Sequence, residues 1–218
     1  VNFLEKNLDN SMCFHPVKAI YEDHSKEDEV LPLTEQRFGK KILGLNNLLI
    51  RNFIYTSSVM YRWRFVEENI KDVFPKDIMP GDWYLHMLHA QKGKIGFIDE
   101  IMAVYRRHQG GIWWEADKNV DSLHLKFGIQ EFNFFKNVYE NFTNNSRQYL
   151  EECLLPFGKY LVNLFLSNKE VAKLKEFSKL HKSYYKLILG EVHLKDQKVK
   201  EKDKKIQVRY REIILIKL

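Results

Sequence analysis

The chain has 218 residues, of which 44% are hydrophobic, 29% charged and 14% aromatic. This composition is typical of a globular protein with at least one full core, and it excludes a wholly disordered or collagen-like chain. The net charge is +6, but residues 195–218 alone contain nine Lys or Arg against four Asp or Glu, so the rest is nearly neutral. A nucleic-acid-binding surface over the body of the protein is therefore not expected.

The two cysteines, Cys13 and Cys153, are far apart and form no C-x-x-C pair, which argues against a disulfide framework or a thiolate zinc site. No apolar run has the length of a membrane-spanning helix, and no signal-peptide pattern appears. We therefore expect a cytoplasmic protein. The opening at Val1 reads as the end of a helix that leads into a strand with nothing upstream to pair it, so we expect a fragment of a longer protein.

The first half of the chain predicts mixed α and β structure. Residues 11–23 and 52–63 are rich in strand formers, and between them the apolar side chains of residues 34–52 recur at the spacing of one helix face. Prolines stop any helix before residue 81 and place the next helix start at Gly81-Asp82.

Gly93 is expected to end that helix as a left-handed cap. Two strands are expected next, over residues 94–98 and 100–108. The glycine pair Gly110-Gly111 then predicts a flexible loop.

The second half of the chain predicts long helices. Their expected ranges are 123–142, 147–166 with a kink at Pro156, and 169–189. The expected fold class is α/β, a partial mixed sheet with flanking helices followed by a mostly helical region. The expected regions are 1–116 (mixed α/β), 117–194 (a helical extension) and 195–218 (a basic amphipathic tail).

The segment from residue 52 to 114 contains the side chains best suited to chemistry. Asp82 is either the N-cap of its helix or a carboxylate that opens into a cleft. The cluster Arg106, Arg107 and His108 ends a strand; it is either an exposed strand end or a site where arginines bind phosphate and the imidazole binds a metal.

Three further patterns leave alternatives open. Asp82, His86 and His89 lie at i, i+4 and i+7, so they could present metal ligands on one helix face or be ordinary structural residues. Trp113 and Trp114 could stack on a sugar or belong to the core. The basic tail could dock on anionic lipid at the inner face of the membrane, or it could be a solvated or partner-packed helix.

Two stretches, "TSSVMYRWRF" and "MPGDWYLHMLHAQKGKIGFIDEIMAVYRRHQGG", resemble the C-terminal half of the catalytic domain of bacterial family 2 glycosyltransferases. The resemblance covers roughly residues 1–114. It implies a GT-A fold that binds a nucleoside-diphosphate sugar with a divalent metal, Mg or Mn. It also implies inverting transfer of the sugar to a hydroxyl of a glycan or lipid-linked acceptor, in surface polysaccharide or glycan synthesis.

By position, Asp82 resembles the catalytic base of the family, and His108 resembles its late histidine near metal and diphosphate. The residues that the resemblance assigns to the donor and its diphosphate are Arg106, Arg107, His108, Gly110 and Gly111. Trp113 and Trp114 are assigned to the loop over the donor and to sugar stacking.

One motif of the family is missing. Its D-x-D metal motif would lie upstream of Val1, so we expect this chain alone to lack a competent donor site. Two other hypotheses remain. The chain could be a non-catalytic module for protein interaction or membrane docking, or a metal hydrolase built on Asp82, His86 and His89.

Overall fold

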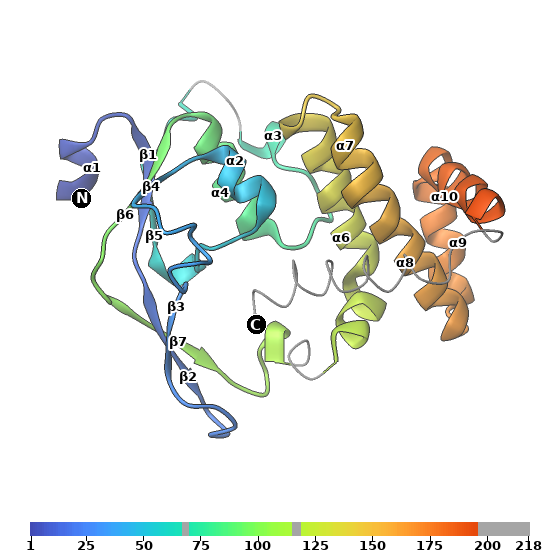
Figure 1. Cartoon of the computed structure of the whole chain (residues 1–218), viewed down its shortest axis with the longest axis horizontal. Coiled ribbons are helices and arrows are strands. Elements are labelled where there is room, and N and C mark those ends of the chain that lie inside the picture. The colour runs from blue at the N-terminus through green and yellow to red at the C-terminus, as the bar shows by residue number, and fades with distance from the viewer. Residues whose placement is uncertain (67–69, 115–118, 196–218) are drawn as a thin grey trace. The chain divides into compact units, whose positions relative to one another are not determined.

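In a computed structural model of the protein, residues 1–66, 70–114 and 119–195 are described, except for the side chains of residues 71 and 191–195. The described residues form two compact units, 1–76 with 80–114, and 77–79 with 119–195 (Figure 1). The first unit is mixed α/β and the second is helical, which confirms the predicted fold class. The predicted basic tail lies outside the described residues, apart from the backbone of Lys195.

The α/β unit contains two small sheets. The first has the order β4 (Ile42–Leu43), β6 (Lys94–Phe97), β1 (Asn10–Phe14), β5 (Val59–Tyr61). The second has the order β3 (Glu29–Leu31), β2 (Val17–Tyr21), β7 (Ala103–Arg107). In each sheet one pair of strands is parallel, β1 with β6 and β2 with β7, and the other pairs are antiparallel.

The strand predicted over residues 11–23 is interrupted at His15-Pro16. Proline has no N–H to donate to a ladder, so it separates β1 from β2 and lets the chain pass from the first sheet to the second. The chain also passes from the first sheet to the second between β6 and β7. The parallel pair β1 and β6 is therefore continued by the parallel pair β2 and β7 (Figure 1).

Helix α4 (Gly81–Gln91) begins where the sequence predicts, and it is buried along most of its length. It packs against α2 (Leu45–Ile50) and against β1, and the indole Nε1 of Trp83 donates a hydrogen bond to the carbonyl of Leu48 at 2.9 Å. Two further short helices are α1 (Asn2–Lys6) and α3 (Ile70–Val73). Because Trp83 and Leu48 are both buried, the hydrogen bond between them fixes the position of the first turn of α4.

The helix predicted over residues 34–52 is wrong except for α2. Residues 38 and 39 adopt positive φ angles of 58° and 63°, which no continuous helix tolerates, and β4 follows them. Only residues 59–61 of the predicted strand 52–63 form a strand, after a 3-10 turn at Thr56–Ser58.

Gly93 is not a left-handed cap. Its φ lies outside the left-handed region, and a Cβ there would lie 2.6 Å from the carbonyl oxygen of Asp9. Glycine is needed at this position because two backbone segments approach closely.

The helical unit consists of α6 (Val120–Phe142), α7 (Arg147–Tyr149), α8 (Leu155–Ser167), α9 (Val171–Leu180) and α10 (Lys182–Lys195). A π-helical turn, Leu150–Leu154, lies just before Pro156, which occupies the first turn of α8. The helix predicted over 169–189 is two helices that meet at His181. Phe132, Phe157 and Phe177 are fully buried in the core of this unit. Among the described residues, no helix is both long and apolar enough to cross a bilayer.

Candidate functional site

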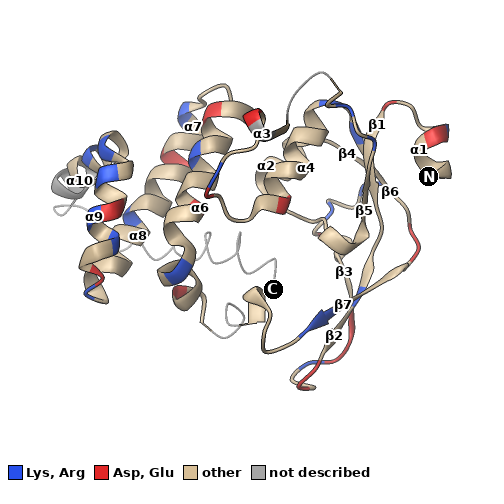
Figure 2. Ribbon diagram, turned by 180° about the vertical axis from the view of Figure 1, so that it is seen from behind, with Lys and Arg blue, Asp and Glu red and all other residues tan. Residues whose placement is uncertain are grey.

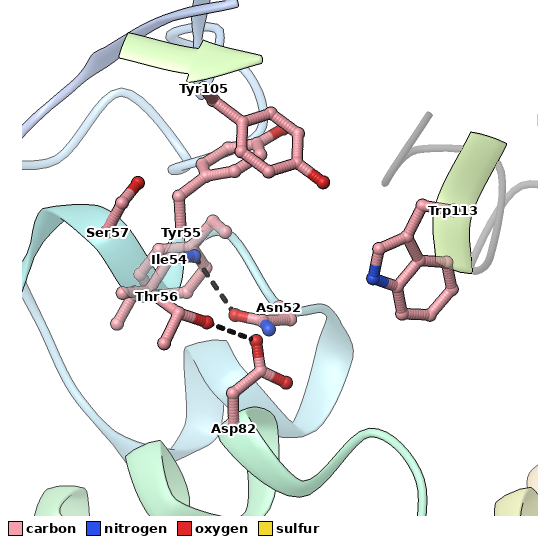
Figure 3. Close-up of a pocket in the computed structure, with 9 residues that line it drawn as sticks. Asn52, Ile54, Tyr55, Thr56, Ser57, Asp82, Tyr105 and Trp113 are labelled. Carbon is pink, nitrogen blue, oxygen red and sulfur yellow. Dashed lines mark hydrogen bonds between the residues drawn. The ribbon is translucent and has the colours of Figure 1, made fainter. Parts of the chain in front are cut away.

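A pocket of about 300 Å³ opens in the α/β unit beside the first turn of α4 (Figure 3). Three places in the sequence contribute to its wall: the segment before β5, the start of α4, and β7 with the residues that follow it. The lining residues are Asn52, Phe53, Ile54, Tyr55, Thr56, Ser57, Asp82, Tyr105 and Trp113. The lining therefore combines polar side chains with aromatic rings.

Asp82 is half-buried and lines this pocket. The N-cap of α4 is Pro80, so Asp82 is not the cap but lies in the first helical turn, where the helix dipole stabilises a negative charge. Its Oδ2 accepts a hydrogen bond from the hydroxyl of Thr56 at 2.8 Å, and its Oδ1 accepts from the N–H of Trp83 at 2.8 Å. These contacts fix the direction of the carboxylate.

The charge of Asp82 also acts on the neighbouring Tyr61. Burial raises the pKa of the Tyr61 phenol above its ordinary value, and the negative charge of Asp82 raises it further. The hydroxyl of Tyr61 therefore stays protonated, and it lies 2.7 Å from Nδ1 of His86. This hydrogen bond joins β5 to α4 behind the pocket.

Tyr55 and Tyr105 form one aromatic wall of the pocket. Their ring centroids are 5.2 Å apart, and burial raises the pKa of the Tyr55 phenol. Trp113 stands on a separate segment across the opening, with its indole turned toward the space that Asp82 also faces (Figure 3). A flat ring beside a carboxylate suits a sugar, whose C–H faces stack on aromatics while its hydroxyls bind polar groups.

Arg106 and Arg107 lie on opposite faces of β7, because side chains alternate along a strand. Arg107 is buried, with its guanidinium 5.7 Å from the ring centre of Tyr21 and 5.8 Å from that of Tyr105. Arg106 is exposed, and its Nη1 is 3.5 Å from Oε1 of Glu22. Neither arginine lines the pocket, so the structure does not bring the expected phosphate-binding pair together there.

His108, Gly110 and Gly111 form a turn after β7. The N–H of Gly110 donates to Nδ1 of His108 at 3.2 Å, and the N–H of Gly111 donates to the His108 carbonyl at 2.9 Å. Trp114 is buried and does not line the pocket, unlike its neighbour Trp113.

Of the two alternatives for Asp82, His86 and His89, the structure favours structural roles for the two histidines, which are fully buried. In the part of the chain that the structure describes, no three His, Cys, Asp or Glu side chains lie close enough to hold a metal ion. His89 instead stacks on Tyr61, with ring centroids 4.3 Å apart, and burial lowers its pKa to about 4. The spacing is correct, but His86 and His89 are packed into the core, whereas Asp82 lines the pocket.

Sequence reasoning missed the polar partners of Asp82. Thr56 is separated from Asp82 by 26 positions, and Asn52 and Ser57 belong to the same segment, which reads as part of a strand. Tyr105 adjoins the predicted cationic cluster but was not itself assigned a role. The only available signal was the run of Asn, Thr and Ser among strand formers, which is typical of a turn.

The chain matches uncharacterized proteins of Mycobacterium bovis and of two Mycobacterium tuberculosis strains, CDC 1551 and H37Rv. Identity is 46% over 116 residues in each comparison, which covers 53% of this chain and 31% of each relative. The chain thus spans about a third of the length of these relatives. No family model and no solved structure matches it. The predicted glycosyltransferase resemblance therefore stays a prediction.

Proposed function

We propose that this chain supplies the acceptor side of a sugar-transferring site, with Asp82 as the general base. The observation that supports the proposal is the position of its carboxylate. It lines a pocket that also presents hydroxyl, amide and aromatic side chains. Such a lining suits a carbohydrate better than a wholly apolar or wholly charged ligand.

The proposed reaction is an inverting displacement at the anomeric carbon of a nucleoside-diphosphate sugar. The acceptor oxygen forms the new bond to that carbon, its proton passes to the Asp82 carboxylate, and the bond to the diphosphate breaks with its electron pair on the leaving group. Thr56 is a positioning residue here, because its hydroxyl holds one carboxylate oxygen at 2.8 Å.

Trp113 and Tyr105 would bind the acceptor sugar. An aromatic face covers the apolar C–H groups of a pyranoside, and the polar lining of the pocket offers Asn52 and Ser57 for its hydroxyls. Trp114 is not part of this proposal, because it is buried.

The divalent cation and the donor diphosphate site remain predictions from the resemblance. Among the described residues no group of three metal-binding side chains forms, so no step of the proposed reaction is assigned to a metal. Arg107 does not line the pocket. Its guanidinium contacts the rings of Tyr21 and Tyr105, so it supports the aromatic wall.

A transfer assay on the natural gene product at its native length tests this function. Radiolabelled nucleoside-diphosphate sugars are offered with and without glycan acceptors, and we expect label in the glycan only when an acceptor is present. Asp82→Asn should lower the signal by about 10²- to 10⁴-fold, whereas Asp99→Asn, which changes an exposed aspartate 3.9 Å from Lys41, should leave it unchanged. Equal transfer by both variants, or no label in any glycan, would contradict the proposal.

A further inference from the structure

Helices α9 and α10 pack against each other and turn a basic, partly apolar surface to solvent. Residues 169–190 contain six lysines and two glutamates. The buried side of the pair holds Phe177 on α9 and Ile188 on α10, with His181 between the helices. The opposite side is therefore available for binding.

We define the α9–α10 outer face by six exposed residues, of which the lysines lie opposite the buried side and the leucines lie along its edge. They are Lys175, Lys179, Leu180, Lys182, Lys186 and Leu187. The lysines follow the helix repeat, at i and i+4 on each helix, so each pair lies on one side of its helix. Blue residues mark both helices in Figure 2.

Within the described ranges, no carboxylate neutralises the lysines of this face. None of the four lysines forms an ion pair with another described residue, whereas Lys173, on the inner side of α9, lies 3.7 Å from Glu170 and donates to the carbonyl of Leu125. The only glutamate exposed on α9 or the described part of α10 is Glu176. A concentration of unpaired positive charge favours an anionic partner.

The exposed leucines favour a bilayer surface over nucleic acid as the anionic partner. Leu180 is 56% exposed and Leu187 is 50% exposed. Nucleic acid offers phosphates but no apolar phase for such side chains, whereas a bilayer surface offers both anionic headgroups and acyl chains. Lysines beside leucines on short helices are typical of segments that lie in a membrane interface.

We propose that the α9–α10 outer face docks on the surface of an anionic phospholipid bilayer. The lysines contact headgroup phosphates, and Leu180 and Leu187 enter the boundary between headgroups and acyl chains. This site lies on described residues and is separate from the basic tail. It goes beyond the proposed sugar transfer, and its test measures binding rather than turnover.

Co-sedimentation of the full chain with vesicles tests the proposal. The probes are phosphatidylcholine vesicles with and without phosphatidylglycerol, and we expect binding only to the anionic ones. Each basic residue near an anionic surface contributes about fivefold to binding, so replacing all four lysines by Gln should weaken it at least about a hundredfold. The variant should keep the circular dichroism of the wild type, because all four side chains are exposed.

A matched control separates this face from overall charge. Lys6, Lys26, Lys40 and Lys76 are exposed lysines of the α/β unit, and their replacement by Gln removes the same charge. The control should bind anionic vesicles as the wild type does. Equal losses in the two variants, or no loss in the α9–α10 variant, would overturn the proposal.

A second variant tests the apolar part. Leu180→Ser with Leu187→Ser keeps the charge, so binding to vesicles should fall while binding to a DNA duplex should not change. If the wild type binds duplex DNA more tightly than anionic vesicles, or if the serine variant binds vesicles normally, the bilayer assignment is wrong.

Discussion

Each unit of the protein contains a carboxylate held by a hydrogen bond, but the two carboxylates differ in their access to solvent. In the α/β unit, Asp82 accepts from Thr56 and lines a pocket. In the helical unit, Oε2 of Glu131 lies 2.7 Å from Nδ1 of His124, and their side chains are only 5% and 3% exposed. Similar local chemistry thus supports a binding site in one unit and a sealed core contact in the other. Access, rather than residue type, separates a candidate catalytic group from a structural one.

The largest effect on stability is expected from breaking the sealed pair. Glu131→Leu leaves Nδ1 of His124 in the core without its hydrogen-bond partner, and leaving a buried polar group unsatisfied costs about 1–3 kcal/mol. Glu151→Leu is the matched control, because Glu151 pairs with Arg147 at the surface and such a pair is worth about 0.3–0.5 kcal/mol. Urea unfolding of the helical unit measures both. If the two variants unfold at the same urea concentration, the sealed pair has no special role.

An effect of comparable size is expected from pH, through one buried histidine in each unit. Both ring nitrogens of His89 and of His181 are buried without hydrogen-bond partners, and burial lowers the pKa of each ring to about 4; Lys136 adds to this at His181. The folded state therefore binds the proton less well than the unfolded state. Stability is full above the ordinary pKa of 6.5 and is lost as pH falls toward 4.

The loss should approach about 3 kcal/mol for each ring, because one pKa unit corresponds to about 1.4 kcal/mol. Amide hydrogen exchange at pH 7 and pH 5 measures the part of this loss that falls in that range, about 2 kcal/mol for each ring, in each unit separately. His89→Phe should reduce the pH dependence of the α/β unit alone, and His181→Phe that of the helical unit alone. Unchanged pH dependence in both variants would show that these rings do not control it.

A smaller difference in stability is expected between variants of two adjacent arginines, Arg106 and Arg107. The Arg107 guanidinium lies near the rings of Tyr21 and Tyr105. Burial and the hydrogen bond to Glu29 raise the pKa of Tyr21, whereas a hydrogen bond from Arg107 lowers it. Arg107→Gln should therefore cost about 1–3 kcal/mol, whereas Arg106→Gln should cost less than about 1 kcal/mol. Thermal unfolding compares the two. Equal effects would contradict the assignment of Arg107 as a buried support of the pocket wall.

Local signals predicted the elements that positioned Asp82. The start of α4 follows from proline and glycine just before it, and β6 and β7 follow from runs of strand formers. Strand periodicity also contained the information that Arg106 and Arg107 face opposite ways, although grouping them by charge obscured it.

The rest of the site depends on tertiary contacts that no local pattern reveals. Thr56 meets Asp82 only because α4 packs on α2 and β1, and the helical pattern over residues 34–52 was broken by two positive φ angles. The His86 and His89 spacing was read correctly as one helix face, but burial of that face required the whole fold. Periodicity shows which residues share a face, not what covers it.

In the proposed reaction, Asp82 takes the proton of the acceptor hydroxyl. The most direct test is the turnover number of Asp82→Asn at saturating donor and acceptor, in the natural gene product at native length. General base catalysis contributes about 10²- to 10⁴-fold, so turnover should fall by that factor while donor affinity and unfolding stay as in the wild type. Near-normal turnover by a folded variant with unchanged donor affinity would contradict the claim.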